Sequence, residues 1–191
     1  PGLVLVNDED LAYAKVRLDK ESREFAIENL SNFEDPLARS VIWTSIWDSA
    51  RDAEIPITDF IDLVLNNIQS ETESTTLLTL IRQLTTSVTL YLPEEQREPV
   101  SSKAAKRFIE LSKAAKPASD LQFQLVKAVG TLATKEQAGW LKDVLTGAEK
   151  IEGLEVDQDL RWELMAGLAT LGMIDLVKLE DELQKDNTAN G

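Results

Sequence analysis

Apolar residues recur at helical spacing along most of the chain from about residue 20 onward. The clearest stripe consists of Leu77, Ile81, Leu84, Val88 and Tyr91, which follow i, i+4, i+7, i+11 and i+14. This spacing places the five side chains on one face of a helix and predicts that this face packs inward. Further stripes predict helices over residues 35–56, 58–70, 93–115, 121–132, 135–145, 157–171 and 174–185.

Several helix ends carry recognisable capping residues. Asp35 followed by Pro36 predicts an N-cap with proline at the first helical position. Thr134 with Gln137 matches a capping box, and Gly172 is suited to the position just beyond a helix C-terminus. These signals divide the chain into about nine helices of two to five turns with short connections.

Residues 3–19 follow a different pattern. An apolar run over 3–6 leads into a polar turn over 7–10, after which apolar and polar positions alternate from Ala12 to Leu18. Alternation with period two on both sides of a turn predicts a β-hairpin. An isolated hairpin is marginal in water, so this hairpin is expected to belong to a sheet of a preceding domain.

Together these patterns predict a mainly α fold. Successive helices in antiparallel pairs favour an α-superhelix or an irregular helical bundle with a short N-terminal β-hairpin. The predicted organisation is a hairpin over 1–19 that ends a preceding β-sandwich, followed by a truncated helical domain over 20–191. The chain begins at Pro1 without an initiator methionine, which indicates a piece of a longer protein.

The charge balance narrows the expected partners. The formal net charge is −14, and residues 1–75 hold 16 acidic and 6 basic side chains. Such a chain repels phosphate backbones and anionic membranes, so neither nucleic acid nor a membrane is an expected partner. With no signal peptide and no apolar run of spanning length, a water-soluble cytoplasmic protein is expected.

The composition also limits the chemistry. The chain has no cysteine and no histidine, which removes thiol catalysis, the commonest general base and the commonest zinc ligand. Neither a phosphate-binding glycine motif nor a calcium loop occurs, and the acidic run 7–10 lacks the glycine and trailing glutamate of such a loop. No catalytic residue and no metal ligand is therefore expected here.

Three groups of residues deserve an explicit interpretation. Asp48 and Asp52 share a helix face and would suit acid–base chemistry only if buried together, so an exposed ionic face including Arg51 is favoured. The tryptophans at helical core spacing are interpreted as core residues rather than a ligand platform; they are Trp43, Trp47, Trp140 and Trp162. A local basic stretch is interpreted as a solvated helix face, with docking on an acidic surface as the alternative; its members are Lys103, Lys106, Arg107 and Lys113.

Two segments in combination carry a family resemblance. LVLVNDEDLAYAKVRLD at 3–19, followed by DPLARSVIWTSIWDSARDAEIP at 35–56, resembles the aminopeptidase N family of zinc metallopeptidases, most closely its actinobacterial members. DQDLRWELMAGLATLG at 157–172 and DNTANG at 186–191 also resemble a late part of that family's helical C-terminal domain. The similarity covers essentially the whole chain.

The resemblance implies that the catalytic residues and this helical segment belong to different domains. In that family the zinc helix, a further glutamate ligand, a substrate-binding segment and a catalytic tyrosine all lie upstream, so none maps onto this chain. Tyr13 belongs to the strand that closes the β-sandwich and is not that tyrosine. The resemblance further implies that the upstream catalytic and β-sandwich domains are partners in one polypeptide. It also implies that zinc serves the full-length enzyme and that the helical domain covers the active site, where it limits access of the peptide substrate.

Two functions from different classes therefore remain. The first is the non-catalytic C-terminal part of a zinc aminopeptidase that removes N-terminal residues from peptides. The second is a stand-alone helical protein-interaction module that binds a partner helix or peptide in a groove. Which residues of this chain would contact substrate is unknown from the sequence.

Overall fold

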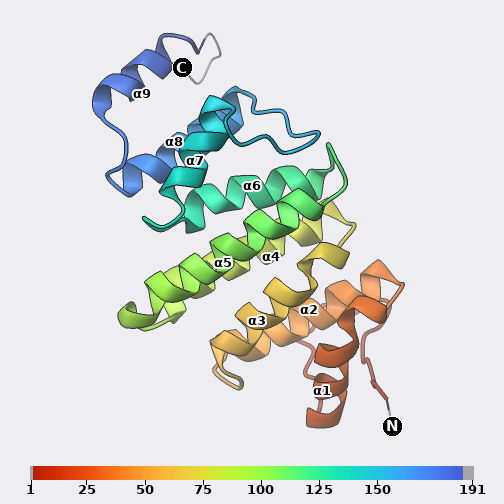
Figure 1. Cartoon of the computed structure of the whole chain (residues 1–191). Coiled ribbons are helices and arrows are strands. Elements are labelled where there is room, and N and C mark those ends of the chain that lie inside the picture. Colours follow the sequence, from red (N-terminus) through yellow and green to blue (C-terminus); the bar gives the residue numbers. More distant parts are fainter. Residues whose placement is uncertain (1, 187–191) are drawn as a thin grey trace. The chain divides into compact units, whose positions relative to one another are not determined.

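The computed structural model describes residues 2–186 and is mainly α, as the periodicity predicts (Figure 1). The segment DNTANG, used in the family resemblance, lies almost entirely outside the described residues. Within them the helices are α1 Lys20–Asn29, η1 Leu30–Asn32, α2 Pro36–Arg51, α3 Ile57–Asn67, η2 Ile68–Ser70, α4 Ser74–Thr86, η3 Ser87–Tyr91, α5 Glu94–Ala114, α6 Asp120–Leu132, α7 Ala138–Thr146, α8 Gln158–Thr170 and α9 Leu176–Leu183.

The chain divides into two compact units, Pro1–Leu92 and Pro93–Gly191. In the first unit, α2 packs against α3, and α3 against α4. In the second unit, α6 packs against both α5 and α8, and Figure 1 shows α5 and α6 side by side and running in opposite directions. Each unit has its own apolar core. The largest fully buried side chains are Leu30, Ile42, Ile46, Phe60, Ile61, Ile68, Leu80 and Leu84 in the first unit, and Phe108, Leu125, Leu132 and Leu141 in the second.

The caps predicted at Asp35 and Gly172 form, whereas the capping box predicted at Thr134 and Gln137 does not begin the helix. There α7 starts only at Ala138, and Gln137 Oε1 accepts from the Thr134 N–H at 3.0 Å. The Asp35 side chain accepts a hydrogen bond from the Leu37 backbone N–H, with Pro36 as the first residue of α2. Asp157 caps α8 in the same way through the Leu160 N–H, and Gly172 follows α8 with a φ of +67°. Such caps satisfy backbone groups that a helix end leaves without an intrahelical partner.

The prediction of a β-hairpin over residues 1–19 is wrong, because no strand occurs among residues 2–186. The turn itself forms: the Asp10 N–H donates to the Asn7 carbonyl at 2.8 Å, and Asn7 has a φ of +59°. The segments on either side of the turn bond to helices instead of to each other. The Val4 N–H donates to Ser22 Oγ of α1, and the Val16 carbonyl accepts from Ser45 Oγ of α2, both at 3.1 Å. These pairings leave no ladder between the two segments.

Two helices end at positions other than those that the apolar periodicity predicts. The helix predicted up to Pro56 ends at Arg51, because Ala53 adopts a left-handed conformation with a φ of +60° that breaks the helix. The stripe through Tyr91 is interrupted by the π-helical turn η3. A π turn holds more residues than an α turn, so Leu92 takes the buried position and Tyr91 is 45% exposed.

Two glycines set the distance between α6 and α8. A Cβ atom added to Gly167 would lie 2.2 Å from the Gly130 carbonyl oxygen, and one added to Gly130 would lie 2.9 Å from the Glu163 carbonyl oxygen. Only the absence of both side chains lets the two backbones approach this closely. No helix among the described residues is long and apolar enough to cross a membrane.

Candidate functional site

The described residues hold no zinc site. Across residues 2–186, no three acidic side chains come together in a way that could hold a metal ion, and the chain has no histidine or cysteine. Zinc in proteins takes imidazole, thiolate and carboxylate ligands, usually three or four of them. The residues present therefore do not fit the zinc ion that the family resemblance implies, and no zinc chemistry is assigned to them.

The acidic turn at residues 7–10 uses its polar groups internally. Asn7 Oδ1 accepts from the Ala12 N–H at 2.8 Å, and Asn7 Nδ2 donates to the Ala12 carbonyl at 2.9 Å. Asn7 Nδ2 also donates to Asp10 Oδ1 at 3.1 Å. These bonds close the turn without any cation. Tyr13, further along the same segment, is fully exposed and contacts no candidate site.

Asp48 and Asp52 form an ion-pair network rather than an acid–base pair. Lys15 Nζ lies 2.6 Å from Asp52 Oδ2, and Arg17 also pairs with Asp52. Arg51 Nη2 lies 3.0 Å from Asp48 Oδ1, as the predicted ionic face requires. Asp48 is nevertheless mostly buried, at 8% exposure, which the prediction of an exposed face did not anticipate.

This network has an electrostatic consequence. The hydrogen bond from Lys15, together with its charge, lowers the pKa of the Asp52 carboxyl below its usual value. An acid held ionised by nearby cations is a poor proton donor near neutral pH. The network therefore ties the segment around Lys15 to the C-terminal end of α2, and sequence alone could not pair residues 35 to 37 positions apart.

The tryptophans are less uniform than predicted. Trp43 is buried at 2% exposure, whereas Trp47, Trp140 and Trp162 are only partly buried. Trp47 packs against Phe60 at a ring-centroid distance of 5.0 Å and against Tyr91 at 6.0 Å. Of the four, only Trp43 is a buried core residue.

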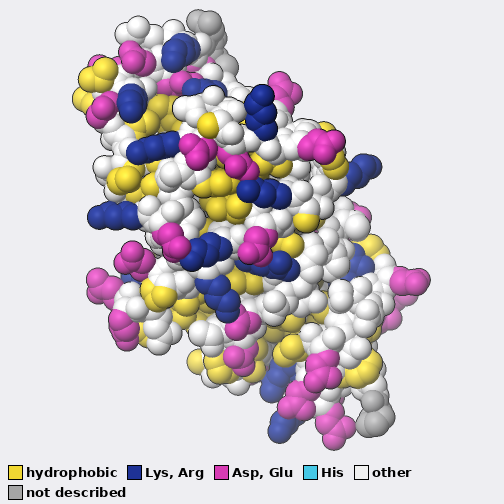
Figure 2. All heavy atoms as spheres, viewed as in Figure 1, with side chains coloured by type: hydrophobic (Ala, Val, Ile, Leu, Met, Phe, Trp, Pro, Cys, Tyr) yellow, Lys and Arg dark blue, Asp and Glu magenta, His cyan; other side chains and the backbone are white. Residues whose placement is uncertain are grey.

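The three lysines of the basic stretch on α5 are exposed, as predicted, whereas Arg107 is partly buried. Two of the lysines pair with glutamates of the same unit. Lys106 Nζ lies 2.6 Å from Glu136 Oε1, and Lys113 Nζ lies 2.7 Å from Glu149 Oε1. The Lys106 hydrogen bond, assisted by Ser102, lowers the pKa of Glu136. Figure 2 shows the wider pattern, with basic and acidic side chains interspersed over the visible face.

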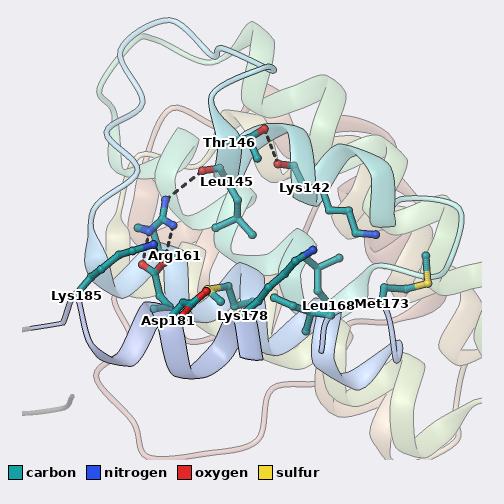
Figure 3. A pocket seen from close by; sticks show the side chains of 12 residues that line it. Lys142, Leu145, Thr146, Arg161, Leu168, Met173, Lys178, Asp181 and Lys185 are labelled. Carbon is teal, nitrogen blue, oxygen red and sulfur yellow. Dashed lines mark hydrogen bonds and ion pairs between the residues drawn. The ribbon is translucent and has the colours of Figure 1, made fainter. Parts of the chain in front are cut away.

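The second unit contains a cavity of about 300 Å³ between α7, α8 and α9 (Figure 3). Its apolar lining includes Leu145, Met165 and Leu168. At one end, Arg161 Nη2 donates to Glu182 Oε2 at 2.8 Å, and Arg161 Nη1 donates to the Leu145 carbonyl at 3.1 Å. The Glu182 hydrogen bond raises the pKa of Arg161, and the Arg161 hydrogen bond lowers the pKa of Glu182.

A second cavity in this unit, of about 430 Å³, lies beside a buried amide. Gln122 Nε2 donates to the Ser112 and Glu152 carbonyls at 3.2 and 3.0 Å, and Gln122 Oε1 accepts from the Ala118 N–H at 3.1 Å. All of these bonds join separate backbone segments. Gln122 therefore has a structural role that its place beside the apolar stripe of α6 does not reveal.

Comparison with known proteins places the chain in a family. The family model for the ERAP1-like C-terminal domain matches residues 3–191. The chain belongs to this family. It is also 36% identical, over 192 aligned residues, to the aminopeptidase N of Streptomyces lividans. That alignment covers the entire chain but only 22% of the relative.

These matches confirm the resemblance to the helical C-terminal domain of the aminopeptidase N family. Among the described residues the fold is built from helices alone. The relative is a much longer protein, so its activity belongs to a polypeptide of which this chain resembles one part.

Proposed function

We propose that this chain is a non-catalytic helical part of a zinc-dependent aminopeptidase N, an enzyme that removes N-terminal residues from peptides. The observation that carries the proposal is the 36% identity to the Streptomyces lividans aminopeptidase N along the entire chain. The match of the ERAP1-like C-terminal domain family to residues 3–191 supports the same conclusion.

The zinc site and the catalytic residues would then lie in other domains of the same polypeptide. The composition supports this division, because a chain without histidine or cysteine lacks the usual zinc ligands and the usual general base. The partners in this proposal are an upstream catalytic domain and an upstream β-sandwich domain. The substrate is a peptide bound by the full-length enzyme.

The proposed role of this chain is to cover the active site and limit which peptides reach it. The segment before α1 offers a surface for contact with the upstream domains. Its apolar side chains Val4, Val6, Leu11 and Tyr13 are 52% to 110% exposed. Apolar groups exposed together along one segment are typical of a surface that packs against another domain.

The first test is enzymatic. The 191-residue chain and the complete open reading frame that encodes it are each assayed with an aminoacyl fluorogenic substrate and zinc. We expect turnover from the complete protein and none from the chain alone. Zinc-dependent cleavage by the chain alone would contradict its non-catalytic assignment. Absence of a His-Glu-x-x-His motif from the complete reading frame would instead favour a stand-alone interaction module.

The second test addresses access to the active site. The complete enzyme is compared with its Leu11→Asp/Tyr13→Asp variant on peptides of increasing length, with Val177→Asp as a control at another exposed apolar position. If the segment helps to seat the helical cover, the double variant accepts long peptides with a higher kcat/KM, relative to short ones, than the wild type does. An unchanged length profile would contradict the covering role.

A further inference from the structure

The cavity between α7, α8 and α9 combines an apolar interior with unpaired cations at its edge. Leu145, Met165 and Leu168 line the interior, and all three are largely shielded from solvent. Its volume of about 300 Å³ is at the lower end of the range for small-molecule pockets, about 300–1,000 Å³. A cavity at this lower end suits a small ligand, of about ten non-hydrogen atoms.

Lys142 of α7 and Lys178 of α9 also line this cavity. Figure 3 shows their amino groups extending from opposite helices into the gap between them. Neither ammonium forms an ion pair within residues 2–186, whereas Lys106, Lys113 and Lys127 of the same unit each pair with a glutamate. Two unpaired ammonium groups at an apolar opening attract an anion.

The opposite end of the cavity is held in place by the bonds of Arg161. Arg161 joins the Leu145 carbonyl of α7 to Glu182 of α9, and Glu182 Oε1 also accepts from Gln158 Nε2 at 3.1 Å. These bonds fix α9 against α7 and α8, so the cavity exists before any ligand binds. A preformed pocket lowers the entropic cost of binding.

We propose that this cavity binds a small amphiphilic carboxylate: a chain of about eight carbons, including the carbon of its single carboxylate head, which suits a cavity of this small volume. The chain would lie against Leu145, Met165 and Leu168, and the carboxylate would bind Lys142 and Lys178. An anion is favoured over a cation because Arg161 and Lys185 pair with Glu182, which leaves Lys142 and Lys178 against the single carboxylate of Asp181 in the lining. The site is separate from the peptide-access role proposed above.

The two methionines of the chain give a selective measurement. Met165 and Met173 both line the cavity, and the chain contains no other methionine. In the 191-residue chain labelled with 13C at the methionine methyl groups, octanoate is expected to shift both resonances in a saturable manner. For about ten non-hydrogen atoms we expect a Kd of about 0.1–1 mM.

The ligand series separates the two parts of the interaction. Octanamide keeps the chain without the charge, acetate keeps the charge without the chain, and octylamine reverses the charge. We expect octanamide and octylamine to bind about tenfold more weakly than octanoate, and acetate to cause no saturable shift. Equal binding of octanoate and octylamine would overturn the assignment of an anion site.

The protein variants test the residues. Lys142→Glu/Lys178→Glu is expected to weaken octanoate binding by about tenfold or more. The control Lys135→Glu/Lys150→Glu makes the same change in net charge at exposed lysines outside the cavity and is expected to leave the Kd within about twofold. Circular dichroism and thermal unfolding establish that each variant is folded. Absence of any saturable methionine shift in the wild type, or an equal loss in both double variants, would overturn the proposal.

Discussion

In each of the two units of this protein, an arginine and a tryptophan of one helix bind acidic side chains from a later segment, one in the first unit and two in the second. In the first unit, Glu71 accepts from Arg39 Nε at 3.2 Å and from Trp43 Nε1 at 2.6 Å. All three residues are buried, at 5% exposure or less. Arg39 also donates to the Phe33 and Glu34 carbonyls, so its remaining donors are partly satisfied as well.

In the second unit the same residue types serve two separate carboxylates. Arg161 binds Glu182, and the adjacent Trp162 donates from Nε1 to Asp186 Oδ2 at 2.7 Å. Glu182 is buried at 3% exposure, but the Arg161 side chain is 29% exposed. This second arrangement holds only α9 and Asp186, which follows it, whereas the first arrangement lies within the core of its unit.

The difference predicts different consequences of breaking each arrangement. A buried charge that loses its partner remains in a poorly polarisable environment, and its desolvation penalty then destabilises the entire fold. A partly exposed charge that loses its partner can be hydrated. We therefore expect global destabilisation in the first unit and local release of α9 in the second.

The largest effect is expected from Glu71→Ala. The substitution leaves the Arg39 guanidinium and the Trp43 indole N–H buried without their acceptor, at a cost of about 3–5 kcal/mol in the free energy of unfolding. Urea denaturation monitored by tryptophan fluorescence measures this loss. The double variant Arg39→Met/Glu71→Leu removes both charges and should recover most of the stability. A loss below about 1 kcal/mol for Glu71→Ala would mean that this ion pair behaves like an exposed one.

Gly167→Ala tests whether the core of the second unit depends on backbone contact instead of an ion pair. The new Cβ atom would lie 2.2 Å from the Gly130 carbonyl oxygen, so α6 and α8 must separate, at a cost of about 1–3 kcal/mol or more. Gly139→Ala in α7 is the matched control, because nothing lies within 4 Å of its Cβ position. Helix propensity should make that variant about 0.5–1 kcal/mol more stable. Equal effects in thermal or urea unfolding would refute the close-packing argument.

Glu182→Gln should have a smaller and local effect. Losing the charge-assisted bond to Arg161 is expected to destabilise the attachment of α9 by about 1–2 kcal/mol. Hydrogen exchange of the amides in Leu176–Leu183 should accelerate by about tenfold, while the midpoint of global unfolding changes little. Glu180→Gln, at an exposed position of the same helix, serves as the control. A global loss comparable to that of Glu71→Ala would remove the distinction between the two units.

The smallest effect on stability is expected from a fall in pH. The pKa of Glu182 is lowered in the folded protein from an ordinary value of 4.5, mainly by the Arg161 hydrogen bond. The stability contributed by this carboxylate is therefore fully present above about pH 4.5 and is lost as the pH falls through the lowered value. Exchange in α9 should accelerate over that acidic range in the wild type. In Glu182→Gln this component should be absent, and an identical pH profile in the two proteins would contradict the assignment.

The local features of the fold follow from local sequence signals. The helix starts at Asp35-Pro36 and Asp157 could be predicted because each cap depends only on residues within the following turn. The register of Tyr91 and the end of α2 could not be predicted. One depends on an inserted π turn and the other on a left-handed alanine, and neither has a periodicity signal.

At the candidate site, the features that could be predicted from composition differ clearly from those that depend on tertiary contacts. The absence of histidine and cysteine, visible in the composition, already argued against a zinc site on this chain. The pairing of Arg161 with Glu182 and the cavity beside it could not be predicted, because they join residues from three helices. The four tryptophans were interpreted as core residues from their spacing, but their different degrees of burial could not be predicted.

The sequence by itself determined that this protein is mainly helical, acidic and related to the C-terminal domain of aminopeptidase N. These properties depend on periodicity, composition and residue identity, which require no knowledge of distant contacts. Only the tertiary structure decided that the segments on either side of the turn at 7–10 bond to helices instead of forming a ladder, and that Gly130 meets Gly167. Both outcomes depend on which backbone groups come within bonding or contact distance, and that is a property of the packed chain.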